Sequence, residues 1–222
     1  TPHPQVDYSK GNNSKFPYAA APTQIINYVS CHDDLMLTDK LRKSMPDATD
    51  AERQRAARLA QTIVLTSQGT PFIFAGEEIF RDKKGVHNSY NSPDSINAID
   101  WNLRHQNAEQ FNYYKELIKL RKEHPAFRMT TAEQIQKHLK FDKVSEPGLI
   151  SYSLLDNANG DVWKEIKVIF NGTDDAKNMK IRKGEWTVVA DDGKINAEGM
   201  GTSKGGTVTV APRSALILAR EK

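Results

Sequence analysis

Two short apolar runs, at residues 25–29 and 71–75, are separated by a longer stretch with helical periodicity. Four of the five residues in each run are hydrophobic, which predicts strands that are buried on both faces. Between them, a helix is predicted at residues 50–67, because Thr49 and Glu52 have the spacing of a capping box and Gly69 follows the expected end. Its apolar stripe consists of Ala56, Leu59, Ala60, Ile63 and Val64. Strand, helix and strand in this order predict a parallel, right-handed unit of an α/β sheet or barrel.

The periodicity changes in the second half of the chain. A further helix is predicted at residues 108–123 and is closed by Pro125. From about Leu139 onward, short β-like runs alternate with Asn-Gly, Asp-Asp-Gly and Gly-Gly turn signals, as an antiparallel β-sandwich requires. These runs are residues 149–155, 166–171, 179–181, 186–189, 208–210 and 215–218. We therefore expect an extended lead-in at 1–22, an α/β part at 23–130 and an all-β domain at 131–222.

Composition excludes several classes of protein. The 222 residues are 38% hydrophobic and 27% charged, with a net charge of only +3, which is typical of a folded chain and not of a disordered one. No apolar run is long enough for a membrane segment, and no block of Lys or Arg indicates a nucleic-acid partner. Cys31 is the single cysteine and leaves the redox compartment open. Because the sequence starts Thr-Pro-His-Pro without a Met, we expect that its natural beginning lies further upstream.

Polar side chains follow both predicted strands, where α/β proteins place their sites. His32, Asp33 and Asp34 follow the first strand and can bind a metal, orient a polyol, stabilise a cation or form a solvated loop. Glu77 and Glu78 follow the second strand, and a structural ion pair and catalysis are both open to them.

The loop after the second strand also carries candidate chemistry. The segment Asn88 to Asp94 combines one aromatic ring, Tyr90, with the amide of Asn91 and the carboxylate of Asp94. Such a set can hold sugar hydroxyls, although turns have the same composition. No Ser-His-Asp arrangement, phosphate loop or cysteine metal motif is present in the sequence.

Other conspicuous residues have structural interpretations. Trp163, Phe170 and Trp186 lie in the predicted β region, where we expect them to pack in the core or on a sheet face. Trp101 is expected to seal the preceding loop against the α/β part. His124 precedes Pro125 and is expected to end the helix, where a cation near the C-terminus is favourable.

Several motifs in order resemble the alpha-amylase superfamily, glycoside hydrolase family thirteen. Ile26-Asn27-Tyr28-Val29-Ser30-Cys31-His32-Asp33-Asp34 resembles the strand-seven motif of its pullulanase branch, followed by Leu37-Thr38-Asp39-Lys40. Asp34 stands where the family usually has Asn. Gly69-Thr70-Pro71 through Gly76-Glu77-Glu78 resembles the strand-eight motif, and Asn88-Ser89-Tyr90-Asn91, Asp94-Ser95-Ile96-Asn97 and Asp100-Trp101 resemble the loop after it. Arg121 to Arg128 and Ala211 to Ala215 are similar to later segments of the same branch.

The resemblance implies that the chain contains strands seven and eight of a TIM (β/α)8 barrel followed by an antiparallel β-sandwich. It implies a retaining debranching hydrolase, in which an Asp nucleophile and a Glu acid/base precede the strand-seven motif. Neither of those two is found here, so we expect the isolated chain to be inactive. Asp33 corresponds to the third carboxylate, which stabilises the transition state, and the substrate-binding candidates are His32, Tyr90, Asn91, Asp94 and Arg81.

The implied partner is an α-glucan polysaccharide or oligosaccharide, with no nucleic acid and no membrane segment. No cofactor is required, and a structural calcium ion is an option for the full-length enzyme. A secreted, cell-surface or periplasmic location is compatible with the resemblance. Two alternatives stay open: another superfamily enzyme of isoamylase-like, branching or amylase type, and a non-catalytic glycan-binding or structural module.

Overall fold

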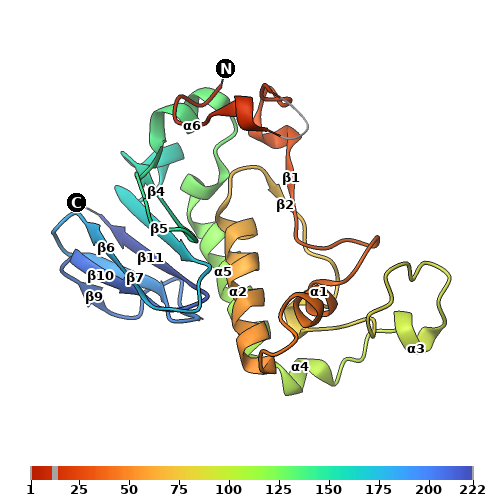
Figure 1. Cartoon of the computed structure of the whole chain (residues 1–222). Coiled ribbons are helices and arrows are strands. Elements are labelled where there is room, and N and C mark those ends of the chain that lie inside the picture. The colour runs from red at the N-terminus through yellow and green to blue at the C-terminus, as the bar shows by residue number, and fades with distance from the viewer. Residues whose placement is uncertain (1, 12–14, 222) are drawn as a thin grey trace.

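The computed structural model describes residues 2–11 and 15–221, so that residues 1 and 12–14 of the expected lead-in and residue 222 lie outside the description. Two long helices run through the middle of the molecule, with antiparallel strands on one side and the irregular loops on the other (Figure 1). The helices are α1 (Leu37–Ser44), α2 (Asp50–Thr66), α3 (Asp94–Asn97), α4 (Leu103–Gln106), α5 (Ala108–Glu123) and α6 (Ala132–His138).

The helix α2 begins and ends where local signals predict. Thr49 Oγ1 accepts the Glu52 amide at 3.3 Å, and the Glu52 carboxylate accepts the Thr49 amide at 2.6 Å, which satisfies two donors of the first turn. The expected apolar stripe is partly wrong, because Ile63 is exposed whereas Gln61 and Thr62 are buried. These polar side chains are buried because they have partners: Thr62 Oγ1 lies 2.8 Å from the hydroxyl of Tyr113 on α5.

Antiparallel strands form most of the second half, as predicted. One sheet has the order β3-β4-β5-β11-β7-β8, with β9 paired to β7, and a second sheet pairs β6 with β10. Their bounds are β3 (Leu139–Phe141), β4 (Leu149–Leu155), β5 (Glu165–Asn171), β6 (Lys177–Ile181), β7 (Trp186–Asp191), β8 (Lys194–Ile195), β9 (Thr202–Ser203), β10 (Gly206–Val210) and β11 (Ser214–Arg220).

The larger sheet is covered on both faces because successive side chains of a strand point to opposite sides. On β11, Ala215, Ile217 and Ala219 join the core beneath α2 and α5. The alternate residues Leu216 and Leu218 pack against Val208 and Val210 of the smaller sheet. Trp163, Phe170 and Trp186 are buried, which confirms the core positions expected for them.

The two parallel strands are shorter and more open than expected. β1 (Ile26–Asn27) pairs in parallel with β2 (Thr70–Pro71), which confirms the strand-helix-strand unit. Burial on both faces is wrong, because Ile26 is 63% exposed, Tyr28 is 53% exposed and Phe72 is also exposed. The reason is that, among the described residues, each strand pairs only with the other and no layer covers these side chains.

The described part of the N-terminal segment crosses the edge of the larger sheet. The side-chain amide of Gln5 donates to the Phe141 carbonyl in β3 and accepts from the Phe141 amide, each at 2.9 Å. Short 3-10 turns follow at Tyr8–Lys10 and Pro22–Gln24. Across residues 2–11 and 15–221, the structure contains no helix of sufficient length and hydrophobicity to cross a bilayer.

Candidate functional site

The polar segment after β1 lies at the carboxyl end of the parallel pair, where α/β sites form. His32 Nδ1 lies 3.3 Å from Asp33 Oδ1, and the two side chains are 79% and 73% exposed. Both groups are therefore accessible to a ligand from solvent. An imidazole and a carboxylate placed side by side can share the hydroxyls of one sugar ring by donating and accepting hydrogen bonds.

The carboxylate of Asp34 has a different partner from that of Asp33. The φ of 60° at Asp34 lies in the left-handed region, which Asn and Asp enter more readily than other non-glycine residues. Its carboxylate lies 2.7 Å from His87 Nε2, in the loop after β2. The backbone at this position thus accepts either Asp or the Asn that is usual in the resembling motif.

Buried polar side chains support the loop after β2 from beneath. The two carboxylate oxygens of Asp39, in the first turn of α1, accept the amides of Lys83 and Gly85 at 2.7 and 2.8 Å. Lys83 Nζ donates to Ser89 Oγ at 2.7 Å, and Asn97 Nδ2 donates to the Ser89 carbonyl at 2.7 Å. These bonds anchor the loop to α1 and to itself, although it has little regular structure.

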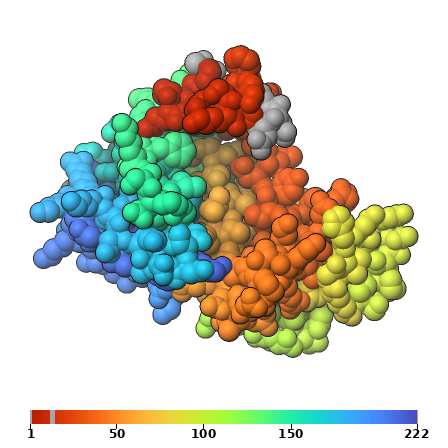
Figure 2. Space-filling model, viewed as in Figure 1, coloured from red at the N-terminus to blue at the C-terminus, as the bar shows by residue number. Residues whose placement is uncertain are grey.

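Tyr90 and Asn91 follow Ser89 at the outside of this loop, and both are exposed. In Figure 2 the loop projects from the molecule on the side away from the antiparallel strands. Trp101, which we expected to seal the loop, is 63% exposed. That expectation is wrong, because a turn held by the Asp100 carboxylate on the Asn102 amide at 3.0 Å leaves the indole on the surface.

Arg81 and Asp94 line one polar cavity of about 520 Å³ beside α1, α3 and α4. Arg81 is buried, and its guanidinium donates to the Ala75 carbonyl at 3.1 Å and to the Asn97 carbonyl. Burial lowers the pKa of this guanidinium. Its Nε has no partner among the described residues. The cavity therefore groups two of the six predicted site residues and does not include His32 or Asp33.

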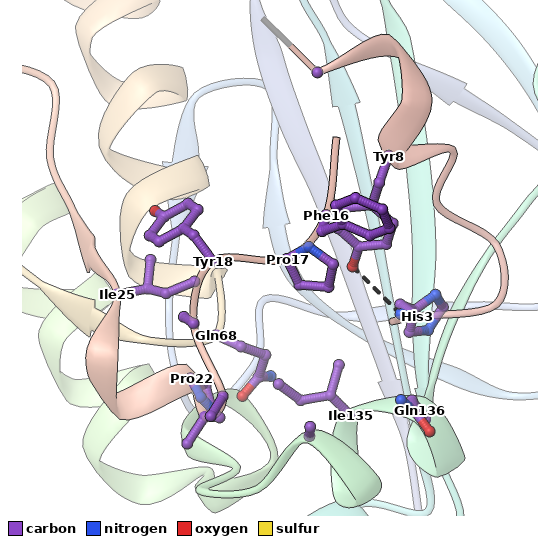
Figure 3. Close-up of a pocket in the computed structure, with 15 residues that line it drawn as sticks. His3, Tyr8, Phe16, Pro17, Tyr18, Pro22, Ile25, Gln68, Ile135 and Gln136 are labelled. Carbon is purple, nitrogen blue, oxygen red and sulfur yellow. Dashed lines mark hydrogen bonds between the residues drawn. The ribbon is translucent and has the colours of Figure 1, made fainter. Parts of the chain in front are cut away.

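An apolar cavity of about 410 Å³ lies elsewhere, between the N-terminal segment and α6. Figure 3 shows Phe16, Pro17 and Tyr18 on one side of it and Ile135 on the other. Its lining provides few polar groups, and none of the six predicted site residues belongs to it. Within residues 2–11 and 15–221, no three His, Cys, Asp or Glu side chains are grouped to hold a metal ion.

Glu77 is the most perturbed carboxyl group near the strand ends. It is 2% exposed, it accepts a hydrogen bond from the Ser30 hydroxyl, and it accepts the Gln61 amide at 2.6 Å. Burial raises its pKa to about 7, the charge of Glu78 adds to this effect, and the Ser30 and Gln61 hydrogen bonds oppose it. A carboxyl group of this kind changes charge near neutral pH.

Sequence reasoning missed the supporting roles of Asp39 and Asn97, and it left Glu77 open between a structural ion pair and catalysis, whereas the structure bonds Glu77 to the uncharged side chains of Ser30 and Gln61. Asp39 and Asn97 lie inside the motifs that carry the resemblance. The motifs therefore included these residues but did not indicate which groups they contact. Their partners are 44 residues away for Asp39 and 8 residues away for Asn97, and such pairings depend on the fold.

The arrangement defines a two-part protein of the α/β plus antiparallel β class. It joins a parallel α/β unit, which carries polar groups at the carboxyl ends of its strands, to a packed antiparallel β region. A ligand that meets exposed His, Asp, Asn and Tyr side chains on such loops is polar and rich in hydrogen-bonding groups.

Comparison with known proteins shows that the chain is similar to pullulanases in sequence and in structure. A sequence model of the pullulanase all-beta domain matches residues 135–194. The pullulanase of Bacillus subtilis (strain 168) is 42% identical over 173 residues, which are 78% of this chain and 24% of that protein. The solved pullulanase from Bacillus acidopullulyticus superposes with a TM-score of 0.87 at 41% identity, covering 90% of this chain and 25% of that one.

A further solved structure covers nearly the whole chain. The Paenibacillus barengoltzii pullulanase in complex with maltohexaose and alpha-cyclodextrin matches 98% of this chain and 32% of its own length, with a TM-score of 0.86 and 36% identity. The chain is thus a relative of pullulanases, which confirms the resemblance carried by its motifs. It spans 24%, 25% and 32% of the length of these three relatives.

Proposed function

We propose that the chain forms the C-terminal part of an alpha-glucan debranching glycoside hydrolase. The enzyme cleaves α-1,6-glucosidic bonds in pullulan, starch or glycogen by a retaining mechanism. One observation carries the proposal: His32 and Asp33 lie exposed at the carboxyl end of β1, in a chain that is similar to pullulanases over most of its length. Its partner is the α-glucan substrate.

We propose that β1 and β2 are strands seven and eight of a TIM (β/α)8 barrel. Support comes from the exposed Ile26, Tyr28 and Phe72, which are apolar side chains of the kind that barrel strands bury. The pair also has unpaired outer edges among the described residues, and a closed barrel removes such edges.

We place the boundary between the barrel part and the β-sandwich domain after residue 130. Leu59 and Leu120 of the helices share a core with Ile166 and Ile217 of the larger sheet. The two parts therefore pack as neighbours across a continuous apolar interface.

In the proposed reaction, Asp33 binds the hydroxyls of the reacting glucose and stabilises the oxocarbenium-like transition state. His32 binds the same sugar. Tyr90, Asn91 and Asp94 line neighbouring subsites. Arg81 contributes a guanidinium to the lining of the polar cavity.

The isolated chain is inactive in this proposal. Hydrolysis with retention needs a nucleophile and an acid/base, and the sequence contains neither of the motifs that carry them in the resembling family. Asp33 alone cannot perform both roles.

A chimera tests the function. The corresponding quarter of the Bacillus subtilis pullulanase is replaced by this chain, and the release of reducing ends from pullulan is measured. We expect the chimera to be active and the isolated chain to be inactive. Asp33→Asn in the chimera should lower kcat and kcat/KM equally, by about two to four orders of magnitude, because the interaction is made mainly in the transition state.

Asp34→Asn is the matched control. It restores the residue usual in the family at a position where the backbone accepts both, so kcat should stay within about tenfold. Near-normal turnover in Asp33→Asn, or pullulan hydrolysis by the isolated chain that Asp33→Ala abolishes, would contradict the proposal.

A further inference from the structure

Among the described residues, two polar contacts join the segment that carries His32 and Asp33 to the chain after β2. One is the pair of Asp34 with His87, in which both side chains are largely exposed. Exposed pairs of this kind contribute little to holding a conformation, because solvent screens them. The other contact joins the buried hydroxyl of Ser30 to the buried carboxyl of Glu77, 47 residues later in the chain.

Glu77 lies where three elements meet. It begins the 3-10 turn Glu77–Ile79 after β2, and its own amide donates to the Phe74 carbonyl at 3.1 Å. One carboxylate oxygen accepts from Ser30 at the exit of β1, and the other accepts from Gln61 of α2 at 2.6 Å. Its side chain therefore connects the end of β1 to the end of β2 and to the helix between them.

We propose that Glu77 is a positioning residue of the candidate site. Its carboxyl group holds Ser30 and thereby sets where His32 and Asp33, two and three residues later, leave β1. Glu77 acts through Ser30 and is itself too buried to meet a substrate. The catalytic consequence rests on the proposed function, whereas the positional role concerns this chain alone.

Three neighbouring polar groups face the Glu77 carboxyl group and influence its protonation. Glu78, the next residue, directs its carboxylate to the Gly76 amide at 2.9 Å. α5 contributes the buried hydroxyl of Tyr114, whose pKa is raised by burial and by the charges of Glu77 and Glu78. α2 contributes the neutral amide of Gln61.

The ionised carboxylate accepts hydrogen bonds from both Ser30 and Gln61. Once protonated, one of its oxygens becomes a donor, so one bond must reverse or break. Hydrogen bonds to a charged carboxylate are also stronger than those to a neutral group. The strength with which Ser30 is held therefore depends on the charge of Glu77, and burial raises the pKa of this group to about 7.

Backbone amide NMR relaxation on the full chain tests the positional role. In Glu77→Ala, we expect the order parameters of Cys31, His32 and Asp33 to fall from the rigid-backbone value of about 0.85 to below about 0.6, because the buried bond to Ser30 is lost. Glu78→Ala is the matched control, since this neighbouring carboxyl bonds to Gly76 and not to Ser30.

The distribution of the change separates positioning from general stability. A positioning role confines the fall in order parameter to residues 30–34, whereas a merely structural role lowers it equally in α2 and α5. Equal decreases in those helices, or unchanged order parameters at 31–33, would overturn the proposal. If Glu77→Ala does not fold, Ser30→Ala removes the same bond from the other side and must give the same pattern.

The pullulanase chimera tests the catalytic consequence. Glu77→Gln retains a side chain that can donate to Ser30 and accept from Gln61, so we expect kcat to fall by less than about threefold, whereas Ser30→Ala should lower kcat about tenfold with little change in KM. A Ser30→Ala loss that appears in KM alone would overturn this arm. An inactive chimera would contradict the proposed function, and the order parameters of residues 31–33 would still decide the role of Glu77.

Discussion

Replacing Glu77 with Gln should make the chain more stable at alkaline pH and leave its stability almost unchanged in acid. The buried carboxyl group has a pKa of about 7 in the folded chain, against an ordinary value of 4.5. Because the folded-state pKa is raised, the folded chain binds the proton more tightly than the unfolded chain does. The contribution of Glu77 to stability is therefore greatest below pH 4.5 and is lost as the pH rises from 4.5 to 7.

The size of the effect follows from the two pKa values. Their difference is about 2.5, and one unit corresponds to about 1.4 kcal/mol, so the full effect is on the order of 3 kcal/mol. The substituted amide in Glu77→Gln keeps the shape of the side chain, donates to Ser30 and accepts from Gln61, and carries no charge. At pH 8 the variant should thus gain up to about 3 kcal/mol over the parent, and at pH 4.5 the two should differ by less than about 1 kcal/mol.

Urea unfolding followed by tryptophan fluorescence at pH 4.5, 6, 7 and 8 measures this difference. Urea is uncharged and leaves the ionic strength constant across the series. Glu123→Gln serves as the control, because the Glu123 carboxyl group is exposed at the end of α5. A difference between parent and Glu77→Gln that is the same at all four pH values, or a variant that is less stable than the parent at pH 8, would refute the reasoning.

Three further outcomes are expected. Gly205→Ala should destabilise the chain by more than about 2 kcal/mol in urea unfolding, because an added Cβ would lie 2.2 Å from a backbone oxygen. Gly85 has a similar φ but open space around it, so Gly85→Ala should cost only about 1 kcal/mol. Equal costs for the two variants would contradict this reasoning. Arg121→Met should lose about 3 kcal/mol, because three backbone carbonyls lose their donors, with the exposed Lys122→Met as a neutral control in the same assay. Asp39→Asn should speed amide hydrogen exchange in residues 83–89 about tenfold, because it replaces one carboxylate oxygen with an NH2 group that faces a backbone N–H donor. Unchanged exchange would show that the loop keeps its conformation without the bonds to Asp39.

Local signals determined the elements that depend on neighbouring residues. The capping pair of Thr49 and Glu52 placed the start of α2, and Pro125 closely follows the end of α5. The short β-like runs bounded by turn signals placed β4 and β5 to within a residue. The sequence also contained the ordered motifs that relate the chain to pullulanases, including the His32-Asp33 pair.

Tertiary structure alone decided which side chains are buried and what they contact. The apolar runs around Ile26 and Phe72 are exposed because burial requires neighbouring strands, which the local pattern does not supply. Arg81 proved to be buried against backbone carbonyls, a position that no spacing in the sequence indicates. Glu77 and Glu78 are the same residue type in adjacent positions, yet only Glu77 reaches the interior between α2 and the end of β1. Burial removes water from the Glu77 carboxyl group, so only the fold could decide that this group titrates near neutral pH.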